Sequence, residues 1–348
     1  MLTAALAQAE APPPPAIDPR GYVCVRAAAP LQIDGRLDDA PWRDAPWTTD
    51  FVDIEGDAKP RPALVTRAKM LWDDEYFYVA AELREPHLWA TLTEHDAVIF
   101  QDHDFEVFID PNGDNHEYYE FEINALGTGW DLLLPRPYKD GGSAVHNWEI
   151  PGLKSAVHLD GSVNDPSDVD RGWSVELAFP WRVLKEVARR DAPPKDGDQW
   201  RVNFSRVEWT LRVVDGRYQK VPGTKEDNWV WSPQGVVNMH RPETWGYVQF
   251  SSSRPGAVAY QPDASLPARR WLNRVYYAQR EYRGRNQRWA RTLQELGLGA
   301  LGEAALNRPT LEATPALFQA SVELQLPGGK TQRWNIRQDA LVWPDAPR

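Results

Sequence analysis

Apolar and polar residues alternate in short runs along residues 31–250, and turn residues separate the runs. A period of two predicts half-buried strands, and it is found at 104–110, 118–124, 172–179 and 199–206. Two further β-rich runs, 66–72 and 76–82, are joined by an acidic turn and predict a hairpin. Strands at this spacing, with few helical stretches between them, predict an all-β fold, an antiparallel β-sandwich.

Helical periodicity occurs in only two places. Residues 180–190 predict a short helix, and residues 268–298 predict a longer one that is rich in Tyr and Arg. Three strand-like pieces follow at 320–326, 331–337 and 340–343. We therefore expect a sandwich at 28–251, a Ser/Pro/Ala-rich linker at 252–267 and a small C-terminal α+β appendage at 268–348. The appendage either packs back on the sandwich or provides an assembly contact through its helix.

The first residues resemble the end of an export signal. Ala7-Gln8-Ala9 is a small-x-small pattern after a short apolar stretch, and four prolines follow at 12–15. We interpret 1–27 as a signal-peptide remnant and a Pro-rich leader, which predicts a secreted or periplasmic protein; the alternative is a simple Ala-rich end. No apolar run reaches the roughly 18 residues of a membrane helix, so no membrane span is expected.

The charge is unevenly distributed over the 348 residues. Residues 1–250 carry 25 Lys and Arg against 42 Asp and Glu, whereas residues 251–348 carry 14 against 8. An acidic main body argues against nucleic acid as a partner and suits neutral ligands or divalent cations. The single cysteine, Cys24, excludes an intramolecular disulfide and a Cys-rich zinc module.

Tryptophan is unusually frequent, with 17 residues. Flat rings at a surface are suited to stacking on sugars, and loop aromatics are the better surface candidates. Four tryptophans lie in the irregular segments 128–150 and 222–240, namely Trp130, Trp148, Trp229 and Trp231. The alternative is that these rings plug the ends of the sandwich.

The densest group of acidic residues lies on two predicted neighbouring strands. Alternation places Asp104 with Glu106 on one face of the first strand, and Glu120 with Glu122 on one face of the second. Such a face could form a binding groove, a calcium site or the carboxylate pair of a glycoside hydrolase. It could also be a solvated sheet face.

A second acidic segment, 160–170, is rich in oxygen ligands. Asp165, Asp168 and Asp170 are candidate ligands for a structural calcium ion, although the segment lacks the EF-hand pattern. The alternative is an ordinary Asx-rich turn. No other cofactor is expected, and the common nucleotide and serine-hydrolase motifs are not found in the sequence.

Several segments, in order and spacing, resemble carbohydrate-binding module family 9 and its DOMON-like relatives. They are 33–42, 71–79, 104–110, 119–124, the pair Trp231-Ser232 and 242–246. The resemblance covers about residues 28–251. It implies a β-sandwich with structural calcium that grips the end of a glucan or xylan chain between two tryptophans.

The resemblance can be carried over to individual positions. The first clamp aromatic falls on Phe100 and the second on Met239, which has no ring and is followed by His240. The polar contact falls on Glu106, and the basic contact falls on Glu122, which reverses its charge. With the loop aromatics, the expected carbohydrate-binding residues are Phe100, Glu106, Glu122, Trp130, Trp148, Trp229, Met239 and His240.

Three functions follow from these patterns. The first is an exported protein that binds a plant- or microbial-type polysaccharide or oligosaccharide in a groove of the sandwich. The second is a glycan-active enzyme that uses Asp104, Glu106, Glu120 and Glu122. The third, suggested by haem-carrying DOMON-like relatives, uses Met239 and His240 as axial ligands.

Overall fold

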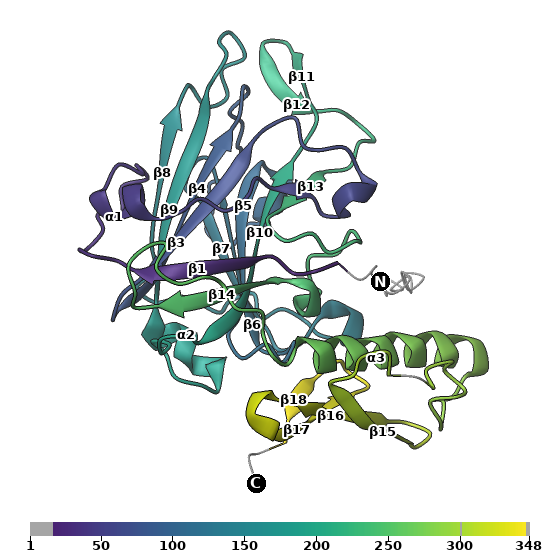
Figure 1. The fold of residues 1–348 in the computed structure, drawn as a ribbon. Helices are drawn as coiled ribbons and strands as arrows, with labels where there is room; N and C mark the ends of the chain where they lie inside the picture. Colours follow the sequence, from purple (N-terminus) through teal and green to yellow (C-terminus); the bar gives the residue numbers. More distant parts are fainter. Residues whose placement is uncertain (1–16, 300, 346–348) are drawn as a thin grey trace. The chain divides into compact units, whose positions relative to one another are not determined.

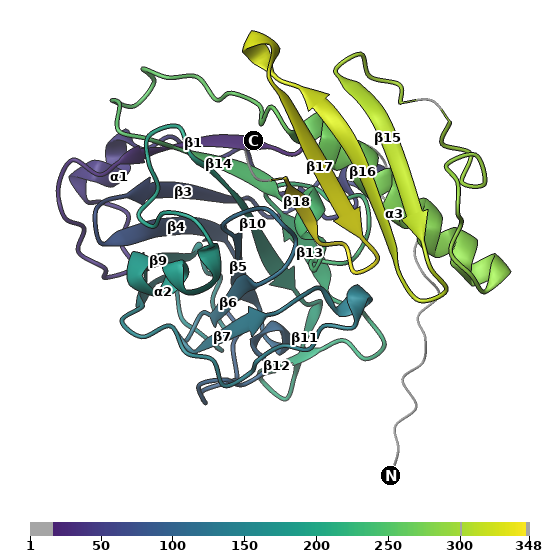
Figure 2. The same cartoon turned by 90° about the horizontal axis from the view of Figure 1, so that it is seen from below.

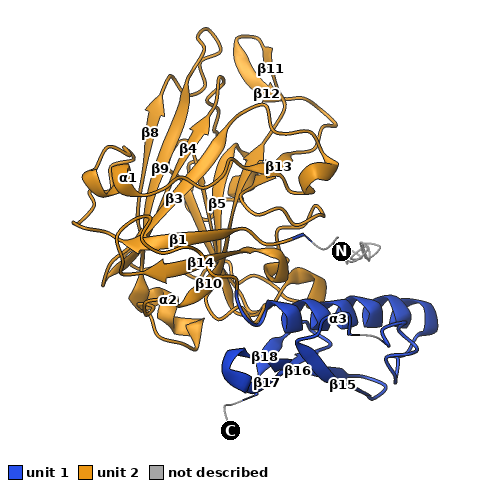
Figure 3. Cartoon of the chain, viewed as in Figure 1, with its two compact units in different colours: residues 1–17, 263–348 blue, residues 18–262 orange. Residues whose placement is uncertain are grey.

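The computed structural model describes residues 17–299 and 301–345, which form two compact units (Figure 3). One unit spans residues 18–262, and the described part of the other begins at Asp263, with Ile17 assigned to it as well. The predicted cleavage pattern at 7–9 and the prolines at 12–15 lie outside the described residues. None of the helices in the described ranges is both long and apolar enough to cross a membrane.

The first unit is a sandwich of two β layers (Figure 1). One layer contains β2 (Val52–Asp53), β5 (Asp104–Asp110), β6 (Tyr118–Asn124), β7 (Gly129–Leu134), β10 (Gln199–Glu208), β13 (Asp227–Val230) and β14 (Gly246–Ser251). The other contains β1 (Gly21–Arg26), β3 (Thr66–Trp72), β4 (Tyr76–Arg84), β8 (Lys154–Asp160) and β9 (Gly172–Pro180). The predicted all-β antiparallel sandwich is therefore confirmed.

The two layers meet where β1 lies between β14 and β3, in the order β7-β6-β5-β10-β14-β1-β3-β4-β9-β8. β1 pairs in parallel with both neighbours, and the other strand pairs of the sandwich are antiparallel. The first strand of the sandwich therefore begins at Gly21. The assignment of all of residues 1–27 to the leader was wrong.

Shorter elements complete this unit. They are the helices α1 (Ala40–Asp44) and α2 (Trp181–Ala188), the hairpin β11 (Leu211–Val214) with β12 (Arg217–Lys220), and the 3-10 turns η1 (Gly56–Ala58), η2 (Ile99–Gln101), η3 (Tyr138–Asp140) and η4 (Pro242–Thr244). The predicted helix at 180–190 is confirmed by α2.

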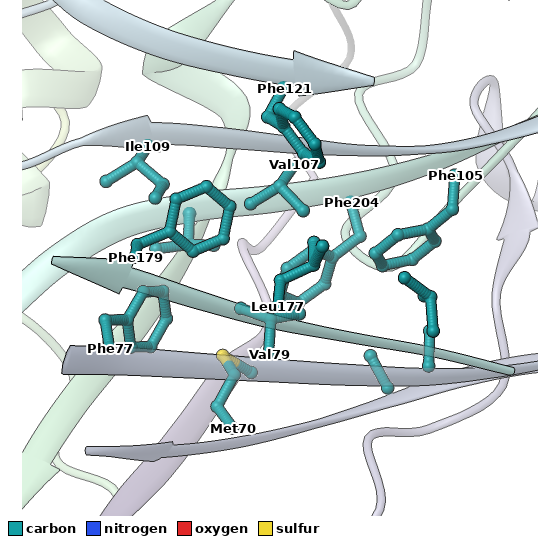
Figure 4. Close-up of a cluster of buried hydrophobic side chains, with 14 of the residues drawn as sticks. Met70, Phe77, Val79, Phe105, Val107, Ile109, Phe121, Leu177, Phe179 and Phe204 are labelled. Atoms are coloured by element: carbon teal, nitrogen blue, oxygen red, sulfur yellow. The ribbon is translucent and has the colours of Figure 1, made fainter. Parts of the chain in front are cut away.

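The main core lies between the two layers, because the period of two turns every second side chain inward. Met70, Val79 and Leu177 come from one layer, and Val107 and Phe204 come from the other (Figure 4). All five side chains are buried. The opposite faces of the same strands pack into two further clusters of buried side chains.

The second unit packs one helix on a small antiparallel sheet (Figure 2). Its elements are α3 (Leu266–Asn286), β15 (Leu306–Ala313), β16 (Phe318–Gln325), η5 (Pro327–Gly329), β17 (Thr331–Arg337) and β18 (Val342–Pro344). α3 ends at Asn286 rather than near 298, because Gln287 adopts a left-handed conformation. The apolar side of α3 contacts β16 and β17, and its role in assembly stays a prediction.

Candidate functional site

The register of the strands confirms the prediction that the acidic residues of two neighbouring strands share one face of the sheet. Glu106 lies opposite Glu122 on β6 and opposite Ser205 on β10, while Asp104 lies opposite Asn124. We call Asp104, Glu106, Glu120 and Glu122 the acidic face; they lie on the side of the sheet that points away from the main core. All four are only 0–4% exposed, so the interpretation as a solvated sheet face was wrong.

Apolar side chains cover this side of the sheet. Phe108, Tyr118 and Trp130 project from β5, β6 and β7 beside the acidic face, and Ile99 of η2 and Met239 pack against the same cluster. Because the covering residues come from distant parts of the chain, alternation alone gave no sign that the carboxyl groups are buried.

The oxygen atoms of the acidic face are only partly satisfied. Glu122 Oε2 accepts a hydrogen bond from the backbone N–H of Phe100 at 2.8 Å, and Asp104 Oδ1 accepts one from Val207 at 3.2 Å. Asp104 Oδ2, Glu106 Oε2 and Glu120 Oε2 are buried without a hydrogen-bond donor. A buried polar atom without a partner costs free energy, so these oxygens favour a proton or a ligand that donates hydrogen bonds.

Burial raises the pKa values of all four acids. Burial raises the pKa of Glu106 to about 7. Burial and the charge of Glu106 raise the pKa of Asp104, Glu120 and Glu122 well above their ordinary values. Near neutral pH the acidic face therefore holds both protonated and ionised carboxyl groups, and it can donate as well as accept hydrogen bonds.

Aromatic rings stand at the border of the acidic face. The partly buried Phe100 lies in η2, and its carbonyl accepts a hydrogen bond from Trp209 Nε1 at 2.9 Å. Tyr138 is 44% exposed, and its ring centroid lies 4.4 Å from that of His240. Burial and the charges of Glu120 and Glu122 raise the pKa of Tyr138 to about 12. Tyr138 was missed because only tryptophans were considered in the segment 128–150.

The two candidates at the second clamp position already have protein partners. Met239 is buried, and its Sδ accepts a hydrogen bond from Gln234 Nε2 at 3.5 Å. His240 Nδ1 lies 3.0 Å from the hydroxyl of Tyr118, and burial lowers the pKa of His240 to about 3. His240 is therefore a neutral ring that supports Tyr138.

The predicted loop positions of two tryptophans were wrong. Trp130 lies in β7 and Trp229 in β13, and both are buried. Trp130 packs on the same side as the acidic face, whereas Trp229 belongs to the main core and lies under the guanidinium group of Arg206. Trp148 is outside the strands but packs on Tyr119, at the main core. The structure therefore gathers Phe100, Trp130, Met239 and His240 around Glu106 and Glu122, without Trp148 and Trp229.

The candidate calcium ligands of the segment 160–170 bind the backbone around them. Asp170 accepts hydrogen bonds from the N–H groups of Ser162 at 2.7 Å and Leu88 at 2.8 Å. Asp165 accepts from both the N–H and the hydroxyl of Ser167, and Asp168 is exposed. The Asp165 contacts are typical of an Asx turn, whereas those of Asp170 join the segment to itself and to Leu88. Structural calcium at this segment stays a prediction.

The sequence of the sandwich is similar to a known protein family and to parts of several known enzymes. A family model described as carbohydrate family 9 binding domain-like matches residues 33–251. Exoglucanase XynX of Acetivibrio thermocellus is 30% identical over 152 residues, which are 44% of this chain and 12% of that protein. Endo-1,4-beta-xylanase A of Thermoanaerobacterium saccharolyticum is 31% identical over 152 residues, 44% of this chain and 11% of that protein. The chain therefore spans only a small part of the length of these relatives.

Among solved structures, a family 9 carbohydrate binding module from Caldicellulosiruptor kristjanssonii in complex with cellotriose aligns with 70% of this chain and 100% of that chain. The identity is 16% and the TM-score is 0.45. The family model covers more than half of the chain and includes every residue of the acidic face. The chain belongs to the carbohydrate family 9 binding domain-like family.

Proposed function

We propose that this is an exported protein that binds a neutral carbohydrate at the acidic face, between the rings of Phe100 and Tyr138. One observation carries the proposal. Three carboxyl oxygens, Asp104 Oδ2, Glu106 Oε2 and Glu120 Oε2, are buried without hydrogen-bond donors beside two rings that reach the solvent. Sugar hydroxyl groups supply such donors, and aromatic rings pack against the C–H groups of a sugar.

Tyr138 supplies the second ring that position 239 lacks. Its side chain rests on His240, which follows Met239 directly, and the charges of Glu120 and Glu122 act on its hydroxyl. Phe100 is fixed from two sides by Glu122 and Trp209. The two rings therefore border the same carboxyl groups, and those groups fix the orientation of the hydroxyls between the rings.

The relatives suggest which sugars to test. The relatives named above are an exoglucanase and a xylanase, so we propose a glucan- or xylan-type oligosaccharide as the ligand. The secreted or periplasmic location is also part of the proposal, and it rests on the small-x-small pattern at 7–9 and the prolines that follow.

Isothermal titration of the chain with glucose, cello-oligosaccharides and xylo-oligosaccharides tests the proposal. We expect binding by the wild type and about tenfold weaker binding, about 1.4 kcal/mol, for Phe100→Ala and Tyr138→Ala. Tyr282→Ala removes a partly buried tyrosine of the C-terminal unit and should leave the affinity unchanged. No binding to any member of the panel, or equal losses in all three variants, would overturn the proposal.

The acidic face also supports a second candidate, hydrolysis of a glycan. Hydrolysis needs one protonated carboxyl group and one carboxylate, and a pKa of about 7 lets Glu106 act as the proton donor. Incubation with glucan and xylan distinguishes the two functions. Release of reducing sugars that stops in Glu106→Gln would indicate an enzyme, whereas binding without release indicates a binding module. A haem bound by Met239 and His240 would appear in an absorbance scan.

A further inference from the structure

Three carboxylates from separate segments surround one nitrogen of His95. His95 Nε2 lies 3.4 Å from Asp96 Oδ1, 3.5 Å from Asp131 Oδ1 and 3.3 Å from Glu149 Oε2. His95 and Asp96 precede η2, Asp131 belongs to β7, and Glu149 lies before β8. We call these four residues the His95 cluster; they are separate from the acidic face.

A proton on His95 does not account for this arrangement. Nε2 carries at most one hydrogen, and the hydrogen bond to Glu149 Oε2 at 3.3 Å uses it, so this hydrogen is not available to Asp96 or Asp131. Asp96 Oδ1 and Asp131 Oδ1 are buried atoms without a hydrogen-bond donor. The Asp131 side chain is only 4% exposed; its Oδ2 accepts the N–H of Ile150, which leaves Oδ1 directed at His95.

The distances agree with a tetrahedral metal site. Metal–ligand bonds of about 2.0–2.1 Å to nitrogen and oxygen place neighbouring ligand atoms about 3.3–3.4 Å apart. The distances from His95 Nε2 to Asp96 Oδ1, 3.4 Å, and to Glu149 Oε2, 3.3 Å, agree with this value. The ligand atoms of His95, Asp96 and Glu149 also lie within 4.8 Å of one another. A cation bound by His95 Nε2 and Glu149 would also bind Asp96 Oδ1, which the single hydrogen of Nε2 leaves without a donor.

The donor set identifies the class of metal. Calcium takes six to eight oxygen ligands, whereas an imidazole nitrogen with carboxylates suits zinc and its neighbours among the transition metals. We propose that His95, Asp96 and Glu149 bind one divalent transition-metal ion of the zinc class. His95 and Glu149 are 54% and 58% exposed, so an ion reaches the site from solvent, and the buried Asp131 lies beside His95.

Titration of the untagged full chain with Zn²⁺, in excess Ca²⁺, tests this proposal. We expect one Zn²⁺ per chain in the wild type and affinities lower by about tenfold or more in His95→Ala and Glu149→Gln. His146→Ala is the matched control, because His146 is exposed and stacks on Trp130 outside the cluster. Both substituted ligands are more than half exposed, so these variants should fold.

A spectroscopic measurement separates a built site from loose surface binding. Co²⁺ in place of Zn²⁺ should give the visible absorption of a tetrahedral complex in the wild type and in His146→Ala, but not in His95→Ala. Absence of Zn²⁺ binding, or binding that persists in His95→Ala, would overturn the proposal. The sugar titration is independent of either result, because the His95 cluster shares no residue with the acidic face.

Discussion

Glu122 Oε2 and the backbone N–H of Phe100 are joined by a hydrogen bond of 2.8 Å. The bond connects the acidic face to η2, the turn that covers it. The resemblance puts a basic residue at position 122, so the reversal of charge has a structural consequence. The side chain at this position orients the backbone of an aromatic residue, and in the proposed site the second ring comes from Tyr138 instead of position 239.

Glu106→Gln should make the sandwich less sensitive to pH. The pKa of Glu106 is about 7 in the folded state against an ordinary value of 4.5, so only the folded state keeps the proton in this range. The free energy of unfolding therefore falls as the pH rises from about 4.5 to 7, by up to about 3 kcal/mol from this group. Gln does not titrate, so the variant should melt higher at about pH 8 and almost unchanged at about pH 5.

Thermal melts over this pH range measure the effect. Glu303→Gln removes an exposed carboxyl group and serves as the control, with a pH profile parallel to that of the wild type. If the Glu106 variant also ran parallel to the wild type, the acidic face would not hold protons as inferred here.

Arg206→Met should strongly destabilise the sandwich. Arg206 is buried, pairs with Glu85 and Glu208, and donates to the carbonyl of Arg84 at 2.8 Å. Its removal leaves two largely buried carboxylates without their shared guanidinium group, with His103 still 3.6 Å from each, and should cost about 3–5 kcal/mol. Arg67→Met breaks the half-exposed pair with Glu82 and should cost less than about 1 kcal/mol. Chemical denaturation of both variants gives the comparison, and equal losses would contradict it.

Gly35→Ala should cost more than Gly216→Ala, although both glycines have a positive φ, 84° and 72°. A Cβ at position 35 would meet the backbone nitrogen of His158 at 2.5 Å, whereas a Cβ at 216 meets nothing within 4 Å. The left-handed conformation alone costs about 1–2 kcal/mol. We expect Gly216→Ala to show this cost and Gly35→Ala roughly twice as much in equilibrium unfolding. Similar losses of unfolding free energy in the two variants would mean that the backbone of residues 157–158 moves away from the new methyl group.

Gln279→Ala should lower the free energy of unfolding of the C-terminal unit. The Gln279 side chain donates to the carbonyl of Ala290 at 3.0 Å and accepts the N–H of Ala290 at 2.8 Å, and both residues are buried. Loss of both bonds leaves two buried backbone groups unsatisfied and should cost about 2–3 kcal/mol. Hydrogen exchange at the amide of Ala290 should accelerate accordingly. Gln319→Ala, at an exposed strand position, should leave that rate unchanged.

Local patterns were enough to predict the sandwich and the shared face of Glu106 with its neighbours. A period of two is a property of a few consecutive residues, and it is strong at 104–110 and 118–124. It is weak at β7, where the sequence Gly-Trp-Asp-Leu-Leu-Leu does not alternate, so Trp130 was assigned to a loop. β15 was missed for a similar reason, because its register shifts between Asn307 and Thr310.

Burial of the acidic face depends on contacts that sequence patterns do not contain. Met239 reaches the cluster beside Phe108 although more than a hundred positions separate them. The convergence of Asp131 and Glu149 on His95 is of the same kind. Acidic residues are usually solvated, so only the three-dimensional arrangement showed that the acidic face and Asp131 are enclosed.

The parallel pair of β1 and β14 has a consequence for synthesis of the protein. Gly21 pairs with Tyr247, so one of the first strands to leave the ribosome must wait for one of the last strands of its unit. Until then the edge of β1 offers unpaired backbone groups, a template on which a neighbouring nascent chain can add a strand. Translation of some 220 further residues separates the two partners, so chaperone dependence and exchange of β1 between chains are the hazards that this topology carries.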